Sequence, residues 1–193
     1  MILTRQAILS ALQSGDVEIC PFDPEHLSPN SYDVTLHNQL LVYDLTETGA
    51  LDVKRKNPTL EFTIPAEGYV LQPGVLYIGM TRESAISRRY VPMFEGRSSM
   101  GRLGINTHIT AGFGDVGWGY ERTSDGQIIC HHPTWTLEIS VVHPVRVYAG
   151  IRIGQVYFME PKGEIEWYQG KYSQQNKPQA SRAFQDFKNG DPC

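Results

Sequence analysis

Glycine and proline punctuate this chain almost from end to end, and this feature constrains its fold most strongly. The 193 residues include 18 Gly and 12 Pro, scattered along the chain rather than gathered in one linker. Because both residue types mark turns and end helices, this distribution favours many short strands over long helices. Hydrophobic residues make up 40% of the chain, as in ordinary globular proteins. The length allows one domain with a sizeable core.

The pattern of apolar residues predicts the elements of this domain. Thr4 is a candidate N-cap, Gly15 ends the run, and apolar residues recur between them at helical spacing, so we expect a short helix over residues 4–14. Strand-like runs follow, among them "YDVTL", "QLLVYD" and two or three more in "TWTLEISVVHPVRVYAGIRIGQVYFME". We predict a single mainly-β domain over residues 1–193, a distorted β-barrel or jelly roll with one or two short helices. The polar segment from about residue 170 is expected to form an arm.

Charge and cysteine content exclude several classes of protein. The formal net charge of −4 lacks the general footprint of a nucleic-acid-binding protein, so an anionic ligand would need a local cluster of arginines. Five arginines fall within about twenty residues and supply such a cluster, namely Arg82, Arg88, Arg89, Arg97 and Arg102. The three scattered cysteines do not form a disulfide framework, which indicates a reducing compartment. With no membrane-length apolar run and no signal-peptide core, we expect a cytoplasmic protein without a membrane or nucleic-acid partner.

The segment "EGRSSMGRLG", residues 95–104, has two glycines at the spacing of a Walker phosphate-binding loop. That loop requires Lys and then Ser or Thr after the second glycine, whereas Arg102 and a leucine stand here, and it belongs to an α/β fold. The remaining groups still suit an anion, because Arg97 offers a planar guanidinium and Ser98 and Ser99 offer hydroxyls. A helix beginning here would add free backbone N–H groups. The alternative is a capped turn with exposed arginines.

Two acidic residues lie in polar surroundings. Asp115 is flanked by glycines in "HITAGFGDVGW", residues 108–118, where it either contacts a sugar hydroxyl or water or simply forms a turn, the commoner role. In "WTLEISVV", strand alternation places Thr136, Glu138 and Ser140 on one face and apolar residues on the other. Glu138 is therefore a candidate general acid/base if that face lines a pocket, and a solvated carboxylate if it does not.

The sequence "CHH" at residues 130–132, with His143 beyond it, raises the question of a zinc site. A second ligand pair at zinc-finger spacing is missing, and so is the H-x-E…P-C-x-x-C signature of zinc deaminases. We therefore expect a polar loop here and no zinc. The chain also lacks the G-x-S-x-G motif of serine hydrolases and a dinucleotide-binding fingerprint.

Six segments of this chain together resemble one family. They are, in order, "PFDPEHLSPNSYDVTL", "EGRSSMGRLG", "HITAGFGDVGW", "TLEI", "AGIRIGQVYF" and "GKYSQQNKPQASR". The chain resembles the deoxycytidine triphosphate (dCTP) deaminase family of the dUTPase-like superfamily, from residue 2 to about residue 184. A match to one segment arises easily by chance, but a match to six in order does not.

The resemblance implies a homotrimeric enzyme of pyrimidine deoxynucleotide metabolism with sites at clefts between subunits. Its substrate would be dCTP, with Mg²⁺ bound on the triphosphate and with no metal ligand from the protein. dUTP is a second candidate substrate, and dTTP is a candidate inhibitor. The positions that match the family's phosphate and active-site segment are Arg97, Ser98, Ser99 and Arg102. Those that match its sugar, base and further nucleotide contacts are Asp115, Thr136, Leu137, Glu138, Gln155, Tyr168, Lys171 and Gln175, the last two on an arm that folds over the triphosphate.

The resemblance also implies a mechanism without zinc. Glu138 would take a proton from the water that attacks C4 of cytosine and return it to the departing ammonia. Ser98 would help to place this water, and Arg102 would lie near the Glu138 carboxylate and tune its pKa. If dUTP is cleaved as well, Asp115 would orient a water at the phosphates.

Two features depart from the usual pattern of the family. About a dozen residues are added at about 119–134, which we interpret as an insertion beside the active site. The residues after "TA" are Gly112 and Phe113, similar to the branch that both deaminates dCTP and cleaves dUTP to dUMP, whereas many single-activity deaminases resemble "TAHR" there.

Three functions remain open at this point. The first is a hydrolase that deaminates dCTP to dUTP, either stopping there or continuing to dUMP and diphosphate. The second is a dUTP diphosphatase without deamination, although the sugar-stacking Tyr hairpin and Gly-rich C-terminal motif of a plain dUTPase are not clearly present. The third is a non-catalytic nucleotide-binding regulator.

Overall fold

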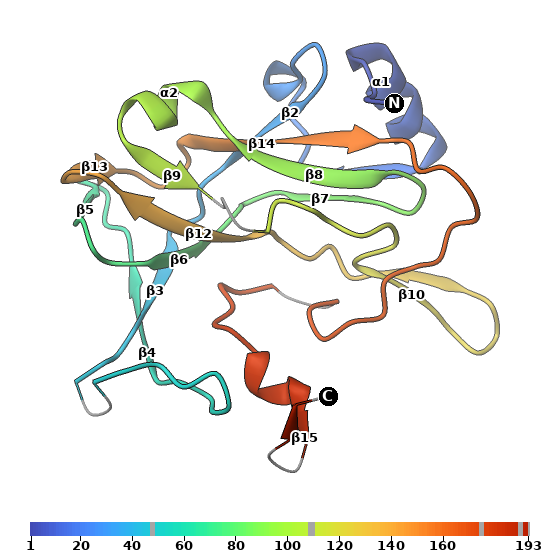
Figure 1. The fold of residues 1–193 in the computed structure, drawn as a ribbon. Coiled ribbons are helices and arrows are strands. Elements are labelled where there is room, and N and C mark those ends of the chain that lie inside the picture. The colour runs from blue at the N-terminus through green and yellow to red at the C-terminus, as the bar shows by residue number, and fades with distance from the viewer. Residues whose placement is uncertain (47–48, 108–110, 174–175, 189–190, 193) are drawn as a thin grey trace.

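A computed structural model describes residues 1–46, 49–107, 111–173, 176–188 and 191–192 of the chain. The fold is mainly β, as the glycine and proline distribution predicts (Figure 1). Every strand pair is antiparallel. Within the described residues the strands form six separate sheets rather than one continuous closed barrel.

The largest sheet has five strands and carries the predicted catalytic strand near its centre. Its strand order is β4 (Thr59–Thr63), β3 (Gln39–Tyr43), β6 (Tyr77–Met80), β12 (Thr136–Val141) and β9 (Ile105–Thr107). The register pairs Glu138 of β12 with Ile78 of β6, and Ile139 of β12 with Thr107 of β9. Because β12 is hydrogen-bonded along both edges, the side chains on its polar face are held at fixed positions.

A second sheet has three strands in the order β2 (Tyr32–Thr35), β14 (Arg152–Met159) and β8 (Val91–Gly96). Its centre depends on a residue without a side chain, because a Cβ on Gly154 would lie 2.1 Å from Cζ of Phe94. Glycine here lets the Phe94 ring pack directly against the backbone of β14. The next residue, Gln155, is opposite Glu95 in the register.

The remaining strands form four two-stranded sheets. These are β1 (Val17–Cys20) with β7 (Ser84–Ser87), β13 (Val145–Val147) with β5 (Tyr69–Leu71), β10 (Tyr120–Arg122) with β11 (Ile128–Cys130), and β15 (Phe187–Lys188) with β16 (Asp191–Pro192). The β10–β11 hairpin lies within the segment interpreted as an insertion, and Figure 1 shows it projecting from the body of the molecule.

The helices are few and short, as predicted. Helix α1 (Arg5–Ser14) begins after Thr4, whose side chain accepts a hydrogen bond from the Ala7 N–H, and ends at Gly15 with φ 71°. The expected helix over residues 4–14 is therefore confirmed. The other helical elements of the described residues are α2 (Ser98–Arg102) and two 3₁₀ turns, η1 (Pro24–His26) and η2 (Ala183–Asp186). None of the helices in the described part of the chain has the length and apolar character needed to cross a membrane.

One hydrophobic cluster joins helix α1 to strand β7 and to strands of the two larger sheets. The large side chains at its centre are at most 2% exposed and include Ile8, Tyr32, Ile86, Phe94, Leu137, Ile139, Ile153 and Phe158. Burial on this scale is the main stabilising contribution to the fold. It also fixes which face of β12 is turned away from the core.

Candidate active site

A cavity of about 440 Å³ lies against the polar face of β12. Strand β12 contributes Thr136 and Glu138, the neighbouring loop contributes Phe113 and Asp115, and β6 contributes Ile78. The C-terminal segment forms another part of the wall with Tyr168, Tyr172, Gln179 and Ser181. Four residues predicted from the sequence therefore line one cavity, namely Asp115, Thr136, Glu138 and Tyr168.

Strand β12 alternates between half-buried and buried residues along its whole length, as its sequence predicts. Glu138 is half-buried, and its Oε2 atom has no exposed surface. The hydroxyl of Thr136 is equally buried and has no hydrogen-bond partner among the described residues. Leu137 has 0% exposure and belongs to the hydrophobic core, so its side chain does not line the cavity.

The segment that carries Asp115 runs beside β8. The N–H of Phe94 donates to the Gly112 carbonyl at 2.7 Å, and the N–H of Gly114 donates to the Pro92 carbonyl at 2.9 Å. A Cβ at Gly114 would lie 2.6 Å from Cη2 of Trp135, so glycine permits this close approach. The Asp115 carbonyl accepts a turn hydrogen bond from Trp118 N–H, while its side chain lines the cavity. Asp115 thus occupies a turn and faces the candidate site at the same time.

Two tryptophans connect the cavity wall to the rest of the protein. The rings of Trp118 and Trp135 meet edge to face with centroids 5.2 Å apart. The indole N–H of Trp135 donates to the Ala85 carbonyl at 2.9 Å, which anchors it to β7. The indole N–H of Trp118 donates to the Tyr172 carbonyl at 2.8 Å, which attaches the C-terminal segment to the cavity.

The C-terminal arm is held over the cavity by further hydrogen bonds. The Ser181 N–H donates to the Tyr43 hydroxyl at 2.9 Å, and the Arg182 N–H donates to the Tyr172 hydroxyl at 2.9 Å. Lys171 forms an ion pair with Asp186, with 2.5 Å between Nζ and Oδ2, and does not line the cavity. Gln175, a predicted nucleotide contact, lies outside the described residues.

A second cavity, of about 570 Å³, contains other predicted residues, namely Arg97, Ser98 and Gln155. Phe113 lines both cavities. Nη2 of Arg97 lies 3.2 Å from Oδ2 of Asp33, a carboxylate that Arg152 also approaches at 3.4 Å. Asp33 is only 4% exposed, so its charge is compensated by these two cations.

Helix α2 begins at Ser98 with Arg97 as its N-cap, so the sequence "SSMGR" does start a helix. Ser99 and Arg102 are exposed on it, and neither lines either of these two cavities in the part of the chain that the structure describes. One chain therefore brings Glu138 together with Thr136 and Asp115, but holds Ser98 in a different cavity from Glu138.

The cluster of five arginines expected from the sequence is not assembled. Arg88 and Arg89 both pair with Asp16, at 3.5 and 3.7 Å, and so face the end of α1 rather than the segment that holds Arg97. Proximity along the sequence was misleading because β7 ends before these residues and the chain then turns into β8. The cation that accompanies Arg97 is instead Arg152 on β14.

Several site residues were missed by the sequence interpretation. Asp33 had a usable signal, since it is a charged residue between apolar neighbours in "SYDVTL". Arg152 had none, because its partner is 119 residues away in the sequence. Tyr43 and Tyr172 also gave no signal, since their proximity depends on how the arm packs on β3.

Comparisons with known proteins show which family this chain is similar to. A family model described as dCTP deaminase-like matches residues 2–161. A relative in Clostridium acetobutylicum named "dCTP deaminase, dUMP-forming" is 45% identical over 191 residues, covering 98% of this chain and 100% of the relative. A relative of the same name in Leptospira biflexa is 47% identical over 189 residues, covering 97% of this chain and 98% of the relative.

A solved structure supports the fold. The crystal structure of 2'-deoxycytidine 5'-triphosphate deaminase from Agrobacterium tumefaciens aligns with a TM-score of 0.54 and 22% identity, over 83% of this chain. The aligned part is 48% of that chain, so the present chain spans about half its length. The family model covers most of the sequence and the relatives align over almost all of it. From these matches, the chain belongs to the dCTP deaminase-like family.

Proposed function

We propose that this protein deaminates dCTP to dUTP and then converts dUTP to dUMP and diphosphate. One observation carries the first half of the proposal: Glu138 lines a cavity together with a buried threonine hydroxyl, a second carboxylate and aromatic side chains. The name of the relatives, which form dUMP, supports the second half.

The cavity suits a pyrimidine nucleoside. Aromatic side chains such as Phe113 and Tyr168 provide faces on which a flat base can stack. The buried Thr136 hydroxyl, without a partner in the described residues, gains a hydrogen bond when a polar ring atom binds beside it. Asp115, at the exposed side of the cavity, is an acceptor for a sugar hydroxyl.

Glu138 would serve as the single acid/base of the deamination. As carboxylate it takes a proton from water while the water oxygen bonds to C4 of cytosine. It then gives that proton to the exocyclic nitrogen, the C4–N bond breaks, and ammonia leaves. The hydroxyl left on C4 then passes its proton to N3, which gives the uracil ring and balances the reaction. Positioned acid/base groups contribute about 10²–10⁴-fold in such steps.

The triphosphate would be bound by arginine and serine from the α2 region. Arg97 is oriented by Asp33, Ser98 lines the same cavity, and Arg102 is exposed on α2. Because Arg97 and Ser98 line a different cavity from Glu138 in one chain, we propose a homotrimer in which α2 of one subunit approaches the Glu138 cavity of the next. This arrangement would place Ser98 and Arg102 near the reacting base.

Magnesium would enter with the triphosphate. Among the described residues, the only cluster of three potential metal ligands contains a thiol and an imidazole, which Mg²⁺ does not favour. Glu95 beside Arg97 and Asp115 beside Glu138 are the further carboxylates of the two cavities, so the residues fit an ion held mainly by phosphate oxygens. When bound, the ion would neutralise phosphate charge, and Asp115 would orient the water that cleaves dUTP.

An assay that follows all products tests this proposal. The purified protein is incubated separately with dCTP and with dUTP in Mg²⁺, and dUTP, dUMP and diphosphate are resolved over time. We expect dUMP, ammonia and diphosphate from dCTP. Release of dUMP from dUTP with no reaction of dCTP would identify a dUTP diphosphatase, and binding without turnover of either would identify a regulator; both contradict the proposal.

A further inference from the structure

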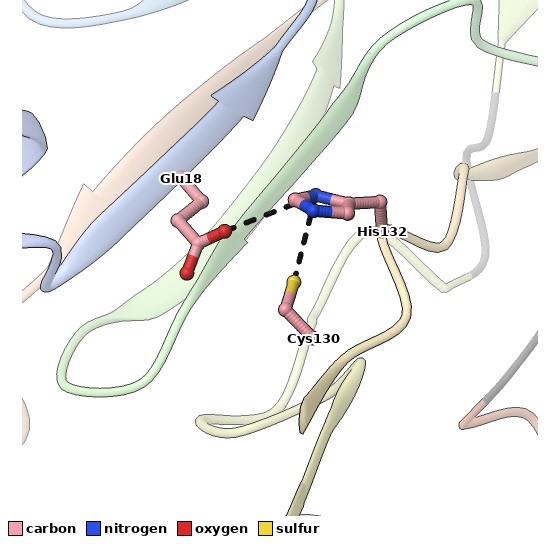
Figure 2. A group of neighbouring side chains, drawn as sticks. All are labelled: Glu18, Cys130 and His132. Atoms are coloured by element: carbon pink, nitrogen blue, oxygen red, sulfur yellow. Dashed lines mark hydrogen bonds and ion pairs between the residues drawn. The ribbon is translucent and has the colours of Figure 1, made fainter. Parts of the chain in front are cut away.

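Three potential metal ligands converge at a place away from the cavity of Glu138. They are Glu18 on β1, Cys130 at the end of β11, and His132 in the connection to β12 (Figure 2). Their ligand atoms all lie within 4.8 Å of one another, and Figure 2 shows the side chains pointing toward a common centre. Glu18 is more than a hundred residues away from the other two in the sequence, and none of the three lines the cavity of Glu138.

The distances in this cluster resemble the edges of a zinc tetrahedron. Sγ of Cys130 and Nδ1 of His132 are 3.5 Å apart, and Nδ1 of His132 and Oε2 of Glu18 are 3.8 Å apart. Ligands bound tetrahedrally, with Zn–S of about 2.3 Å and Zn–N or Zn–O of about 2.0 Å, are separated by about 3.5 Å for S···N and about 3.3 Å for N···O. The thiol and imidazole are already at this separation, whereas the Glu18 carboxylate would have to move about 0.5 Å closer to the imidazole.

Neighbouring groups orient the ligands. The Tyr120 hydroxyl donates to Oε1 of Glu18 at 2.9 Å, which leaves Oε2 directed at His132. The backbone N–H of His132 donates a hydrogen bond to the Cys130 sulfur. Outer hydrogen bonds of this kind are typical of metal sites, because they fix the orientation and charge of each ligand.

The backbone of His132 supports the same interpretation. Its φ of 44° is the only positive value of a non-glycine residue in the described parts of the chain. Residues other than glycine rarely adopt this backbone conformation, and it recurs at functional sites. Here it turns the imidazole back toward Cys130, two residues earlier.

We propose that Glu18, Cys130 and His132 bind one zinc ion, which fastens the β10–β11 hairpin to β1. The fourth position would be taken by water. Sequence motifs for zinc did not reveal this site because Glu18 is distant from the histidines in the chain. The site is structural and separate from deamination, for which Glu138 needs no zinc.

Cobalt substitution of the whole protein tests the proposal. The reduced protein is freed of metal with a chelator and titrated with Co²⁺, which reports its ligands in the absorption spectrum. We expect one Co²⁺ per chain, visible bands of tetrahedral intensity, and a thiolate-to-cobalt charge-transfer band in the near ultraviolet. Cys130→Ser should abolish the charge-transfer band. His132→Gln and Glu18→Gln should keep it but weaken binding at least tenfold, the lower limit for losing even an outer-shell partner.

His131→Gln is the matched control, because Nε2 of His131 lies 2.9 Å from Glu121 rather than facing Cys130. It should bind cobalt as the unmodified protein does. Glu18→Gln keeps an acceptor for the Tyr120 hydroxyl and is expected to fold. Its cobalt affinity therefore decides the outcome if Cys130→Ser fails to fold. The proposal would be overturned if the charge-transfer band is absent at equimolar cobalt or if it survives in Cys130→Ser. Equal losses of cobalt affinity in His131→Gln and His132→Gln would also overturn it.

Discussion

The guanidinium of Arg97 lies against the buried carboxylate of Asp33, with 3.2 Å between Nη2 and Oδ2. Arg152 reaches the same oxygen at 3.4 Å, so two cations share one anion. This pairing holds Arg97 in a defined orientation while leaving positive charge in excess. A negatively charged ligand is the natural complement of such a group, which is why Arg97 is expected to bind phosphate.

Substituting Arg97 with alanine should separate phosphate binding from nucleoside binding. Asp33 keeps Arg152 as a partner, so the protein should fold, while a charge-assisted contact worth roughly 1.5–3 kcal/mol is lost. We expect the Kd for a non-hydrolysed dCTP analogue to rise by about 10–150-fold. The Kd for deoxycytidine should change little. Titration calorimetry with both ligands makes the comparison, and equal losses would show that Arg97 is structural.

Gly114 should tolerate no side chain. An added Cβ would lie 2.6 Å from Trp135 and 2.8 Å from the Pro92 carbonyl, so Gly114→Ala must displace the Asp115 segment. Overpacking of this kind costs about 1–3 kcal/mol, or about 2–12 °C in Tm for a chain of this size. Gly101→Ala is the control for thermal stability, because nothing lies within 4 Å of its added Cβ. Equal melting temperatures for the two variants would contradict this packing.

The hydrogen bond from Trp118 to the arm should contribute to substrate binding. Trp118→Phe keeps an aromatic ring but removes the indole N–H that donates to the Tyr172 carbonyl at 2.8 Å. A loss of about 0.5–1.5 kcal/mol in holding the arm closed should raise KM for dCTP by about 2–12-fold. Steady-state kinetics and circular dichroism check this, and an unchanged KM in a folded variant would show that the arm position does not depend on this bond.

His37 should make the fold sensitive to mild acid. Burial lowers the pKa of His37, and the nearby charge of Arg82 adds to this effect. Between that lowered value and the unfolded value of about 6.5, the unfolded chain binds more protons, so stability falls as pH falls through this range. His37→Asn keeps an acceptor for the Gln39 N–H, which His37 Nδ1 accepts at 3.2 Å.

Between about pH 7.5 and about pH 5.5, the Tm of His37→Asn should therefore fall less than the Tm of the unmodified protein. His143→Asn, at an exposed histidine, controls for the loss of an imidazole. Parallel pH profiles of the unmodified protein and His37→Asn would exclude His37 as a source of acid sensitivity.

Local sequence signals predicted the parts of the fold that local physics determines. Helix α1 begins after Thr4 and ends at Gly15, because capping and left-handed geometry depend on a few neighbouring residues. The alternation of β12 placed Thr136 and Glu138 on one face, since a strand repeats every two residues. Those inferences needed no knowledge of the tertiary structure.

Contacts between distant segments could not be predicted in this way. The sequence grouped Arg88 and Arg89 with Arg97, whereas they pair with Asp16. Arg97 instead shares the carboxylate of Asp33 with Arg152. The proximity of Glu18 to Cys130 and His132 could not be predicted for the same reason, because Glu18 lies on β1. Such pairings follow from sheet order and strand register, which many short strands leave undetermined until the whole chain is packed.

The most direct test of the account is the deamination rate of Glu138→Gln. Glutamine keeps the volume and hydrogen-bonding reach of Glu138 but cannot accept and return a proton. Ser140→Ala, on the same face of β12 but outside the cavity lining, is the matched control. We predict that kcat for dCTP falls by about 10²–10⁴-fold or more in Glu138→Gln, with triphosphate binding and Tm nearly unchanged and dUTP cleavage retained. A folded Glu138→Gln that deaminates dCTP within a few-fold of the unmodified protein would contradict the proposed mechanism.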